Sequence, residues 1–203
     1  MLAFVFWHWP DETTSADEYE RGLAAFHGAL ADAHLEGFRS SASFRVERAP
    51  WSALRGSPAF SPYPPPEATG LLYEDWYLVD GFAALEPLNV GAVSTGPKPL
   101  HDHVAYASAG GAGGVYRLVS GTEQIKALTW AAWLSKPKGT RVADFSAALT
   151  PWIASGEVSL WRRQLVLGPA PEFCLTSAGG VELPPALPVL QTRRSQIWPA
   201  ETR

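Results

Sequence analysis

His8 is the first residue of the chain whose type and position suit acid–base chemistry. It lies near the end of an apolar run at residues 2–9, which has the composition of a strand buried on both faces. Alternate residues of a strand share a face, so His8 lies on the same side as Phe4 and Phe6, opposite Trp7. The ordinary pKa of histidine lies near neutrality, so His8 beside a cavity would suit a general base. A buried histidine with a structural hydrogen bond is the alternative.

The segment at residues 70–79 carries acidic residues on both faces. Glu74 and Trp76 share one face of the predicted strand, and Tyr73, Asp75 and Tyr77 share the other. An unpaired buried carboxylate is costly, so one face must meet a cavity, water or a basic partner. The candidate basic partners are Arg39, Arg45, Arg162 and Arg163.

These strands supply the candidate site residues. We interpret His8 as the proton-transfer group and Glu74 as its orienter or as a second acid/base group, which makes these two the candidate catalytic residues. Tyr73, Trp76 and Arg162 are the candidate ligand-binding residues, because a few polar groups among aromatic ones would orient an apolar molecule. A structural salt bridge inside a barrel is the alternative interpretation of Glu74.

His101, Asp102 and His103 form the densest group of potential metal ligands. Two imidazoles and a carboxylate have the composition of a metal triad, but neighbouring residues of an extended segment point to opposite sides. The sequence therefore predicts a surface loop with local capping by Asp102, and no metal site.

A glycine-rich run at residues 110–114 resembles a phosphate-binding loop in composition. Neither Lys-Ser nor Lys-Thr follows it, and the next residues, Val115 to Leu118, predict a strand. Both common phosphate-binding motifs require a helix N-terminus at this point. We therefore expect a flexible loop or lid without nucleotide binding.

The elements that must position these residues repeat along the chain. A Ser-x-x-Glu capping box at Ser15 begins a helix that reaches about His34. Around it, strands are expected at residues 2–9, 38–46, 70–79 and 115–119, with a short helix near residues 82–88. The second half predicts strands at residues 127–134, 158–167 and 173–176, with a helix after Thr140.

Strand–helix–strand–strand thus occurs twice, which predicts an α+β fold of two ferredoxin-like βαββαβ-type repeats. The first repeat covers residues 1–120 and the second, shorter repeat covers residues 127–203, together as one compact unit. Each repeat leaves one face of an antiparallel sheet bare. The two bare faces are expected to pack into a barrel-like core that encloses a pocket.

Composition excludes several classes of protein. The chain of 203 residues is 46% hydrophobic and 18% charged, an ordinary globular balance, and its net charge of −4 argues against a nucleic-acid-binding protein. A lone cysteine, Cys174, excludes an internal disulfide framework. The apolar N-terminal run is too short for a membrane span and lacks a basic region, so we expect no membrane partner and a cytoplasmic location.

The residues from Gly70 to Trp76, followed by Ala83-Ala84-Leu85-Glu86, resemble the third strand and next helix of the dimeric α/β-barrel superfamily. The most similar branch is that of the antibiotic-biosynthesis-monooxygenase-like proteins. The resemblance covers the element order of residues 1–120 and, more loosely, 127–178. It implies a fused tandem duplication that supplies both halves of a barrel usually built by two chains. Such relatives include cofactor-free monooxygenases, isomerases, haem-degrading enzymes and proteins without a known activity.

The sequence leaves two classes of function open. The first is a small-molecule-binding α+β barrel, with a cofactor-independent monooxygenase- or isomerase-like enzyme acting on an apolar or aromatic compound as its catalytic form. The second is a non-catalytic scaffold or protein-interaction module, with the proline-rich residues 58–66 and the glycine-rich run as contact surfaces. For the first class of function, no cofactor is expected. A haem-binding protein is a third option. The assembly is expected to be a monomer with an intrachain pseudo-dimer, or a homodimer.

Overall fold

The computed structural model describes most of the chain, including every segment that carries the candidate site. The described residues are 1–51, 70–94, 96–125, 128–167, 171–184, 187 and 189–199. The proline-rich residues 58–66 lie outside this part.

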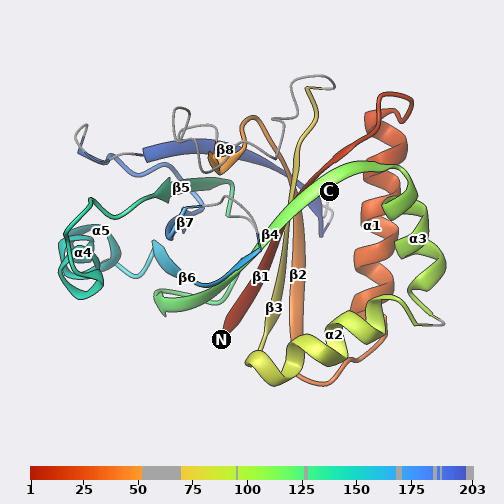
Figure 1. Ribbon diagram of the computed structural model, residues 1–203, viewed down its shortest axis with the longest axis horizontal. Coiled ribbons are helices and arrows are strands. Elements are labelled where there is room, and N and C mark those ends of the chain that lie inside the picture. The colour runs from red at the N-terminus through yellow and green to blue at the C-terminus, as the bar shows by residue number, and fades with distance from the viewer. Residues whose placement is uncertain are drawn as a thin grey trace.

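The first half of the chain contributes four strands and three α-helices. Its elements are β1 (Leu2–Pro10), α1 (Ala16–Asp32), β2 (Phe38–Val46), β3 (Tyr73–Val79), the 3-10 turn η3 (Phe82–Ala84), α2 (Leu85–Ala92), α3 (Lys98–Tyr106) and β4 (Ser108–Ser120). As predicted, the Ser15 side chain caps α1 by accepting a hydrogen bond from the Glu18 amide. The three helices lie together on one side of the strands (Figure 1).

The second half contributes four strands and two short helices, on the opposite side of the molecule (Figure 1). Its elements are β5 (Trp130–Leu134), α4 (Val142–Ala148), α5 (Thr150–Ile153), β6 (Ser159–Leu167), β7 (Phe173–Ser177) and β8 (Val189–Trp198). Helices α4 and α5 cover the outer face of these strands, where Phe145 packs on Phe173 with ring centroids 5.0 Å apart.

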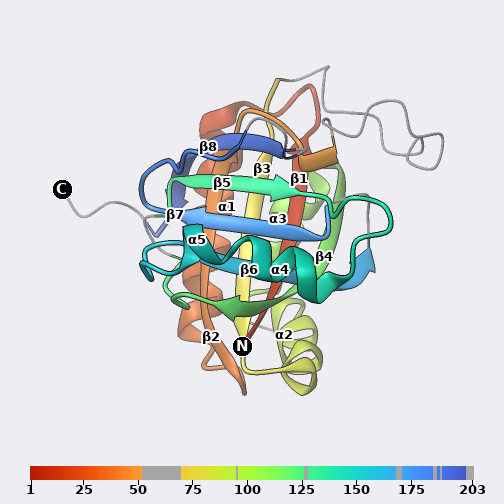
Figure 2. The same ribbon diagram turned by 90° about the vertical axis from the view of Figure 1, so that its left-hand side faces the viewer.

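All eight strands pair antiparallel in one closed barrel, in the order β1-β3-β2-β8-β5-β7-β6-β4. The strands of the first half are contiguous in it (β4-β1-β3-β2), and so are those of the second half (β8-β5-β7-β6). Pairing of β2 with β8 and of β4 with β6 joins the halves. Figure 2 shows the strands of the second half crossing in front of those of the first. The predicted α+β fold with a barrel-like core is confirmed.

Side chains from both halves fill the interior of the barrel. Trp7, Trp76, Trp133 and Trp161 are all fully buried there, and the ring centroids of Trp7 and Trp133 are 5.0 Å apart. The bare sheet faces therefore do meet, as expected, but they form an aromatic core. The expectation of a pocket between them is corrected, because the large indole rings occupy that space.

Two segments differ from the prediction because their neighbours decide their structure. Residues expected to be an irregular loop form helix α3, whose first turn contains Pro99, a residue that needs no intrahelical donor there. The glycine-rich run expected to be a loop or lid forms the start of β4, paired with β1. Within the described residues, no helix has the length and apolarity that a membrane crossing requires.

Candidate functional site: a buried histidine–aspartate group at an apolar cavity

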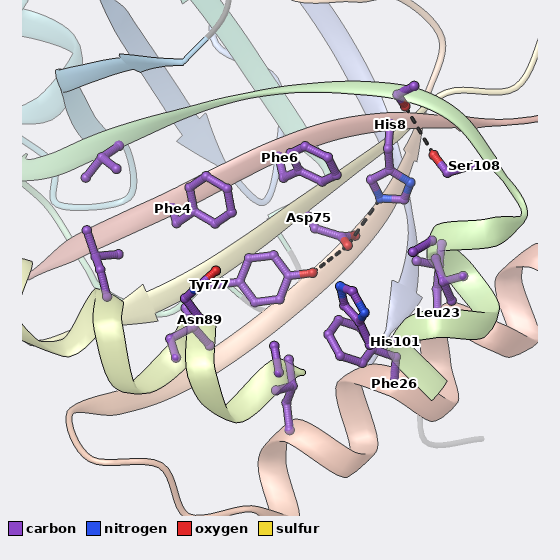
Figure 3. A pocket seen from close by; sticks show the side chains of 18 of the residues that line it. Phe4, Phe6, His8, Leu23, Phe26, Asp75, Tyr77, Asn89, His101 and Ser108 are labelled. Carbon is purple, nitrogen blue, oxygen red and sulfur yellow. Dashed lines mark hydrogen bonds and ion pairs between the residues drawn. The ribbon is translucent and has the colours of Figure 1, made fainter. Parts of the chain in front are cut away.

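A cavity of about 600 Å³ lies between helices α1, α2 and α3 and the outer face of the first-half strands (Figure 3). Most of its wall is apolar or aromatic, with polar side chains from β1, β3, α1 and α3. The lining residues include Phe4, Phe6, His8, Tyr19, Leu23, Phe26, Leu30, Asp75, Tyr77, Leu88, Asn89, His101, Ala105 and Ser108.

Strand alternation explains which side chains reach this cavity. On β1, Phe4, Phe6 and His8 point toward the helices, whereas Trp7 points into the barrel. The glycines of β4 make room for these rings, because a Cβ atom on Gly111 would lie 2.3 Å from Cζ of Phe6. The aromatic rings of β1 can therefore lie across β4 and form part of the cavity wall.

Asp75 is the centre of a buried polar group at this cavity. Its side chain lines the cavity, and the residue is only 2% exposed. The Nε2 atoms of His8 and His27 each lie 3.2 Å from Oδ2 of Asp75. The hydroxyl of Tyr77 donates a hydrogen bond to the same oxygen at 2.8 Å. Three potential donors from β1, α1 and β3 thus converge on one carboxylate.

The Nδ1 atoms of His8 and His27, which point away from Asp75, each contact a hydroxyl group. Nδ1 of His8 lies 2.7 Å from the Tyr19 hydroxyl, and Nδ1 of His27 lies 2.7 Å from Oγ of Ser41. If each ring carries its proton on Nε2, each Nδ1 accepts a hydrogen bond from its hydroxyl partner. Each Nε2 then faces Oδ2 of Asp75 in a close polar contact that lacks the alignment of a hydrogen bond. The group is then a continuous chain from Tyr19 to Ser41.

The electrostatics of the group favour a charged Asp75. Burial alone would raise the pKa of this carboxyl, but the His27 and His8 rings lower the pKa well below its ordinary value. Burial raises the pKa of the Tyr19 and Tyr77 hydroxyls, so both remain protonated donors. Among the described residues, Oδ1 of Asp75 has no hydrogen-bond partner. This oxygen is thus buried and anionic without a donor in the described part of the chain.

Of the five candidate site residues predicted from the sequence, only His8 lines this cavity. Glu74 and Trp76 point into the barrel, where Glu74 accepts hydrogen bonds from Trp7 Nε1, Trp76 Nε1 and Arg194 Nη1 at 2.8, 2.7 and 2.9 Å. The carboxylate beside His8 is therefore Asp75. Glu74 cannot orient His8, because it lies on the other face of β3.

The two remaining predicted residues also lie away from the cavity. The Tyr73 ring stacks on His8 with centroids 5.8 Å apart, but its hydroxyl donates to Oε1 of Glu20. Arg162 lies on β6 in register with Phe173, in the second half. The roles predicted for these two residues in ligand binding stay predictions, without a shared site to support them.

His27 and Asp75 are the residues that sequence reasoning missed. Asp75 was already on the same predicted strand face as Tyr77, and His27 lies on α1 four residues after Leu23 and three before Leu30. That spacing marks the buried stripe of a helix, so periodicity could have placed His27 against the sheet. Nothing in the sequence indicated that both histidines would contact one carboxylate.

The predicted loop that carries the His101-Asp102-His103 group is helix α3 in the structure, and His101 lines the cavity. Oδ1 of Asp102 lies 3.2 Å from Nδ1 of His101, and Asp102 also pairs with Lys98. Within the described part of the chain, no group of three or more His, Cys, Asp and Glu side chains is arranged to hold a metal ion.

Comparison with known proteins shows the fold. No family model matches the sequence, and no curated protein matches it. The crystal structure of a "putative monooxygenase" from Fusobacterium nucleatum is similar, with a TM-score of 0.58 and 8% sequence identity over 97% of this chain and 92% of that one. A "putative monooxygenase" from Lactobacillus acidophilus has a TM-score of 0.56 and 9% identity, over 97% and 94% of the two chains.

Proposed function

We propose that the protein binds a small apolar or aromatic molecule in the cavity beside Asp75 and transfers a proton to or from it without a cofactor. One observation carries this proposal: an anionic, buried carboxylate, approached by three side chains, lines a mostly apolar cavity and has one oxygen without a hydrogen-bond partner among the described residues. The cavity volume of about 600 Å³ lies within the range of small-molecule sites.

The charge of Asp75 defines what the bound molecule must offer. An O–H, N–H or acidic C–H group directed at Oδ1 would satisfy an acceptor that has no partner among the described residues. In a site of low dielectric this hydrogen bond is strong, and the proton can pass into the Asp75–His8–His27 group. His8 keeps its proposed role in proton transfer, with Asp75 as its carboxylate partner.

The apolar wall supports a neutral ligand better than haem. Both nitrogens of His8 already contact protein groups, which leaves His8 without a nitrogen for iron, and the other histidine that lines the cavity, His101, lies at its solvent-exposed edge. Among the lining residues that the structure describes, none is a lysine or arginine that could pair with the haem propionates. An absorbance spectrum of the purified protein tests the haem alternative directly.

We also propose that the chain is a tandem duplication in which the second half stands where other barrels of this kind have a second subunit. The matching strand orders β4-β1-β3-β2 and β8-β5-β7-β6 support this proposal. The described second half has short helices α4 and α5 after β5 but no counterpart of α2 and α3 between β7 and β8. The cavity and its polar group thus belong to the first half, and the second half completes the barrel beneath it.

The binding experiment uses 2-naphthol and 2-methylnaphthalene, which have similar shapes but differ in one hydroxyl donor. We expect 2-naphthol to bind about tenfold or more tightly than 2-methylnaphthalene in a calorimetric titration, because a hydrogen bond to a charged group contributes roughly 1.5–3 kcal/mol. Ala105→Trp places a large ring at an exposed position of the cavity wall and should abolish binding of both molecules.

Ala147→Trp is the matched control, because Ala147 is an exposed alanine on helix α4, on the opposite side of the molecule. This variant should bind 2-naphthol like the wild type. Equal affinity for the two molecules would contradict the role of Asp75. If neither molecule binds, the non-catalytic scaffold becomes the better interpretation.

A further inference from the structure

The cavity contains a second histidine, His101, on a different wall from His8. His101 comes from helix α3, and His8 comes from strand β1 (Figure 3). The edge of the Phe26 ring packs against the His101 ring, with centroids 5.6 Å apart and planes at 65°. The His101 side chain is 34% exposed, so it lies at the edge of the cavity, where solvent can reach it.

Hydrogen bonding determines which ring nitrogen of His101 carries the proton. Hydrogen bonds from Lys98 and His101 lower the pKa of Asp102, so this carboxylate is anionic and acts as an acceptor. Nδ1 of His101 lies 3.2 Å from Oδ1 of Asp102 and is therefore the nitrogen that carries the proton. In the neutral ring the lone pair is then on Nε2, which has no hydrogen-bond partner among the described residues. A histidine oriented by a carboxylate in this way has the arrangement of a general base.

His8 and His101 differ in whether a ring nitrogen is free to contact a bound molecule. Both ring nitrogens of His8 are engaged, one by Tyr19 and the other by Asp75. His101 has one nitrogen held by Asp102 and the other free. A bound molecule can therefore meet the free oxygen of Asp75 on one wall and the free nitrogen of His101 on another.

Packing between α1 and α3 holds His101 in position. The side chain of His103 lies over Gly22 of α1, where an added Cβ atom would be 3.1 Å from its Cδ2 atom. His101 contacts Phe26, one turn further along α1. The helix carrying His101 is thus fixed by close contacts, as a group that must meet a small ligand requires.

We propose that His101 is a second proton-transfer residue and that the site interconverts the enol and keto forms of an apolar carbonyl compound. This inference rests on the proposed function, because it needs a ligand whose hydroxyl faces Asp75. It names the class of ligand, an enolisable ketone, and a reaction that needs neither an oxidant nor a cofactor.

The conversion of enol to ketone balances in protons and electrons. The enol O–H bond breaks, its proton passes to the Asp75–His8–His27 group, and the electron pair forms the C=O bond. The electron pair of the C=C bond takes a proton from Nε2 of protonated His101 and becomes a C–H bond. The protein accepts one proton and gives one. The reverse sequence forms the enol. It begins with the transferred proton on the Asp75–His8–His27 group, which donates it to the ketone oxygen, and with neutral His101, whose Nε2 takes the C–H proton.

Hydrogen exchange in 2-tetralone tests this step without knowledge of the natural substrate. This aromatic ketone has acidic C–H groups at C1, and NMR in D₂O records their replacement by deuterium. We expect the wild-type protein to accelerate exchange above the buffer rate. His101→Gln should lower the protein-catalysed rate about 100-fold, because a general base contributes roughly 10²–10⁴-fold. Asp102→Asn should lower it about tenfold, because it releases the ring orientation.

His34→Asn is the control, since His34 is an exposed histidine just after α1 that does not line the cavity, and asparagine tolerates its positive φ. This variant should exchange 2-tetralone like the wild type. Circular dichroism and a binding titration with 2-tetralone show whether each variant is folded and binds. If His101→Gln is unfolded, free imidazole added to His101→Ala replaces it as the test and should restore exchange.

The outcomes separate the two proposals. If the wild type binds neither 2-naphthol nor 2-tetralone, the proposed binding function fails and this inference fails with it. If 2-tetralone binds but exchanges no faster than in buffer, only the role of His101 is overturned. The same holds if His101→Gln binds the ketone and retains the wild-type exchange rate.

Discussion

Asp75 shows how a charge can be kept inside an apolar wall. An unpaired carboxylate at 2% exposure would be costly, but His8, His27 and Tyr77 all contact one of its oxygens. The partners come from β1, α1 and β3, so the contacts exist only once these elements have packed. The burial of this carboxylate therefore depends on the native packing of all three elements.

Asp75→Asn should lower the free energy of unfolding at neutral pH by about 3 kcal/mol, because it removes a charged acceptor from buried partners. The pH dependence follows from the direction of the pKa shift. A carboxyl whose folded pKa lies below its ordinary value of 3.8 stabilises the protein above that pH, and the stabilisation is lost as the pH falls below it. Urea unfolding at several pH values should therefore show a steeper acid loss for the wild type than for Asp75→Asn.

Asp144→Asn provides the comparison, since Asp144 is half exposed and pairs with Arg141 on α4. Its unfolding free energy should change by less than about 1 kcal/mol. Identical acid profiles for the wild type and Asp75→Asn would contradict the assignment of a lowered Asp75 pKa.

Alternation along the strands was enough to predict which side chains share a face. It placed His8 with Phe4 and Phe6, and Asp75 with Tyr77, as the structure has them. It could not identify the contact between Asp75 and His27, because that contact depends on how α1 packs on the sheet. For the same reason it could not show that Asp75, and not Glu74, lies beside His8: alternation defines two faces of β3 but not which face meets the cavity.

Strand β4 was predicted only in part, as residues 115–119 of Ser108–Ser120. Glycine has a low strand propensity, so the run at residues 110–114 had the composition of a loop. It forms a strand because β1 pairs along its whole length, and because the rings of Phe4 and Phe6 cover positions where a side chain would clash. Helix α3 lies where an irregular loop was predicted, and its two prolines, Pro97 and Pro99, lie at the N-cap and in the first turn, where a helix tolerates them.

Gly111→Ala tests whether this strand shapes the cavity. The added Cβ atom would lie 2.3 Å from Cζ of Phe6, so the ring must shift, and the cavity is the space beside it. We expect a loss of stability of about 1–3 kcal/mol and several-fold weaker binding of 2-naphthol, measured by thermal unfolding and calorimetry.

Gly179→Ala is the matched substitution, because nothing lies within 4 Å of its added Cβ atom. Stability and binding should both remain close to the wild-type values. A Gly111→Ala protein that binds 2-naphthol with unchanged affinity would show that β4 does not set the size of the cavity.

The closed barrel is held together by contacts between residues far apart in sequence. Glu74 on β3 and Arg194 on β8 form a fully buried ion pair, and the Arg194 guanidinium also lies 4.3 Å from the Phe44 ring centroid. Element order was sufficient to predict a barrel of two halves. It did not reveal this pair, because the proline-punctuated end of the chain gave no clear sign of strand β8.

Arg194→Met should destabilise the protein by about 3–5 kcal/mol, because it leaves the Glu74 charge buried without its partner. The double variant Glu74→Gln/Arg194→Met should recover part of this loss, because it removes the buried charge, although the one amide oxygen can replace only one of the two carboxylate oxygens that accept from Trp7 and Trp76. Chemical unfolding of both variants measures the difference.

Arg141→Met breaks an exposed ion pair with Asp144 and should cost less than about 1 kcal/mol. A double variant no more stable than Arg194→Met would mean that the buried charge is not the source of the loss.

Closure of the ring also affects how the protein behaves toward copies of itself. Each of the eight described strands has a hydrogen-bonded neighbour on both sides, so this part of the chain presents no open sheet edge. An open edge offers unpaired amide and carbonyl groups on which a second polypeptide can add a strand and start aggregation. By pairing β2 with β8 and β4 with β6, the chain removes that template while keeping its long aromatic strands.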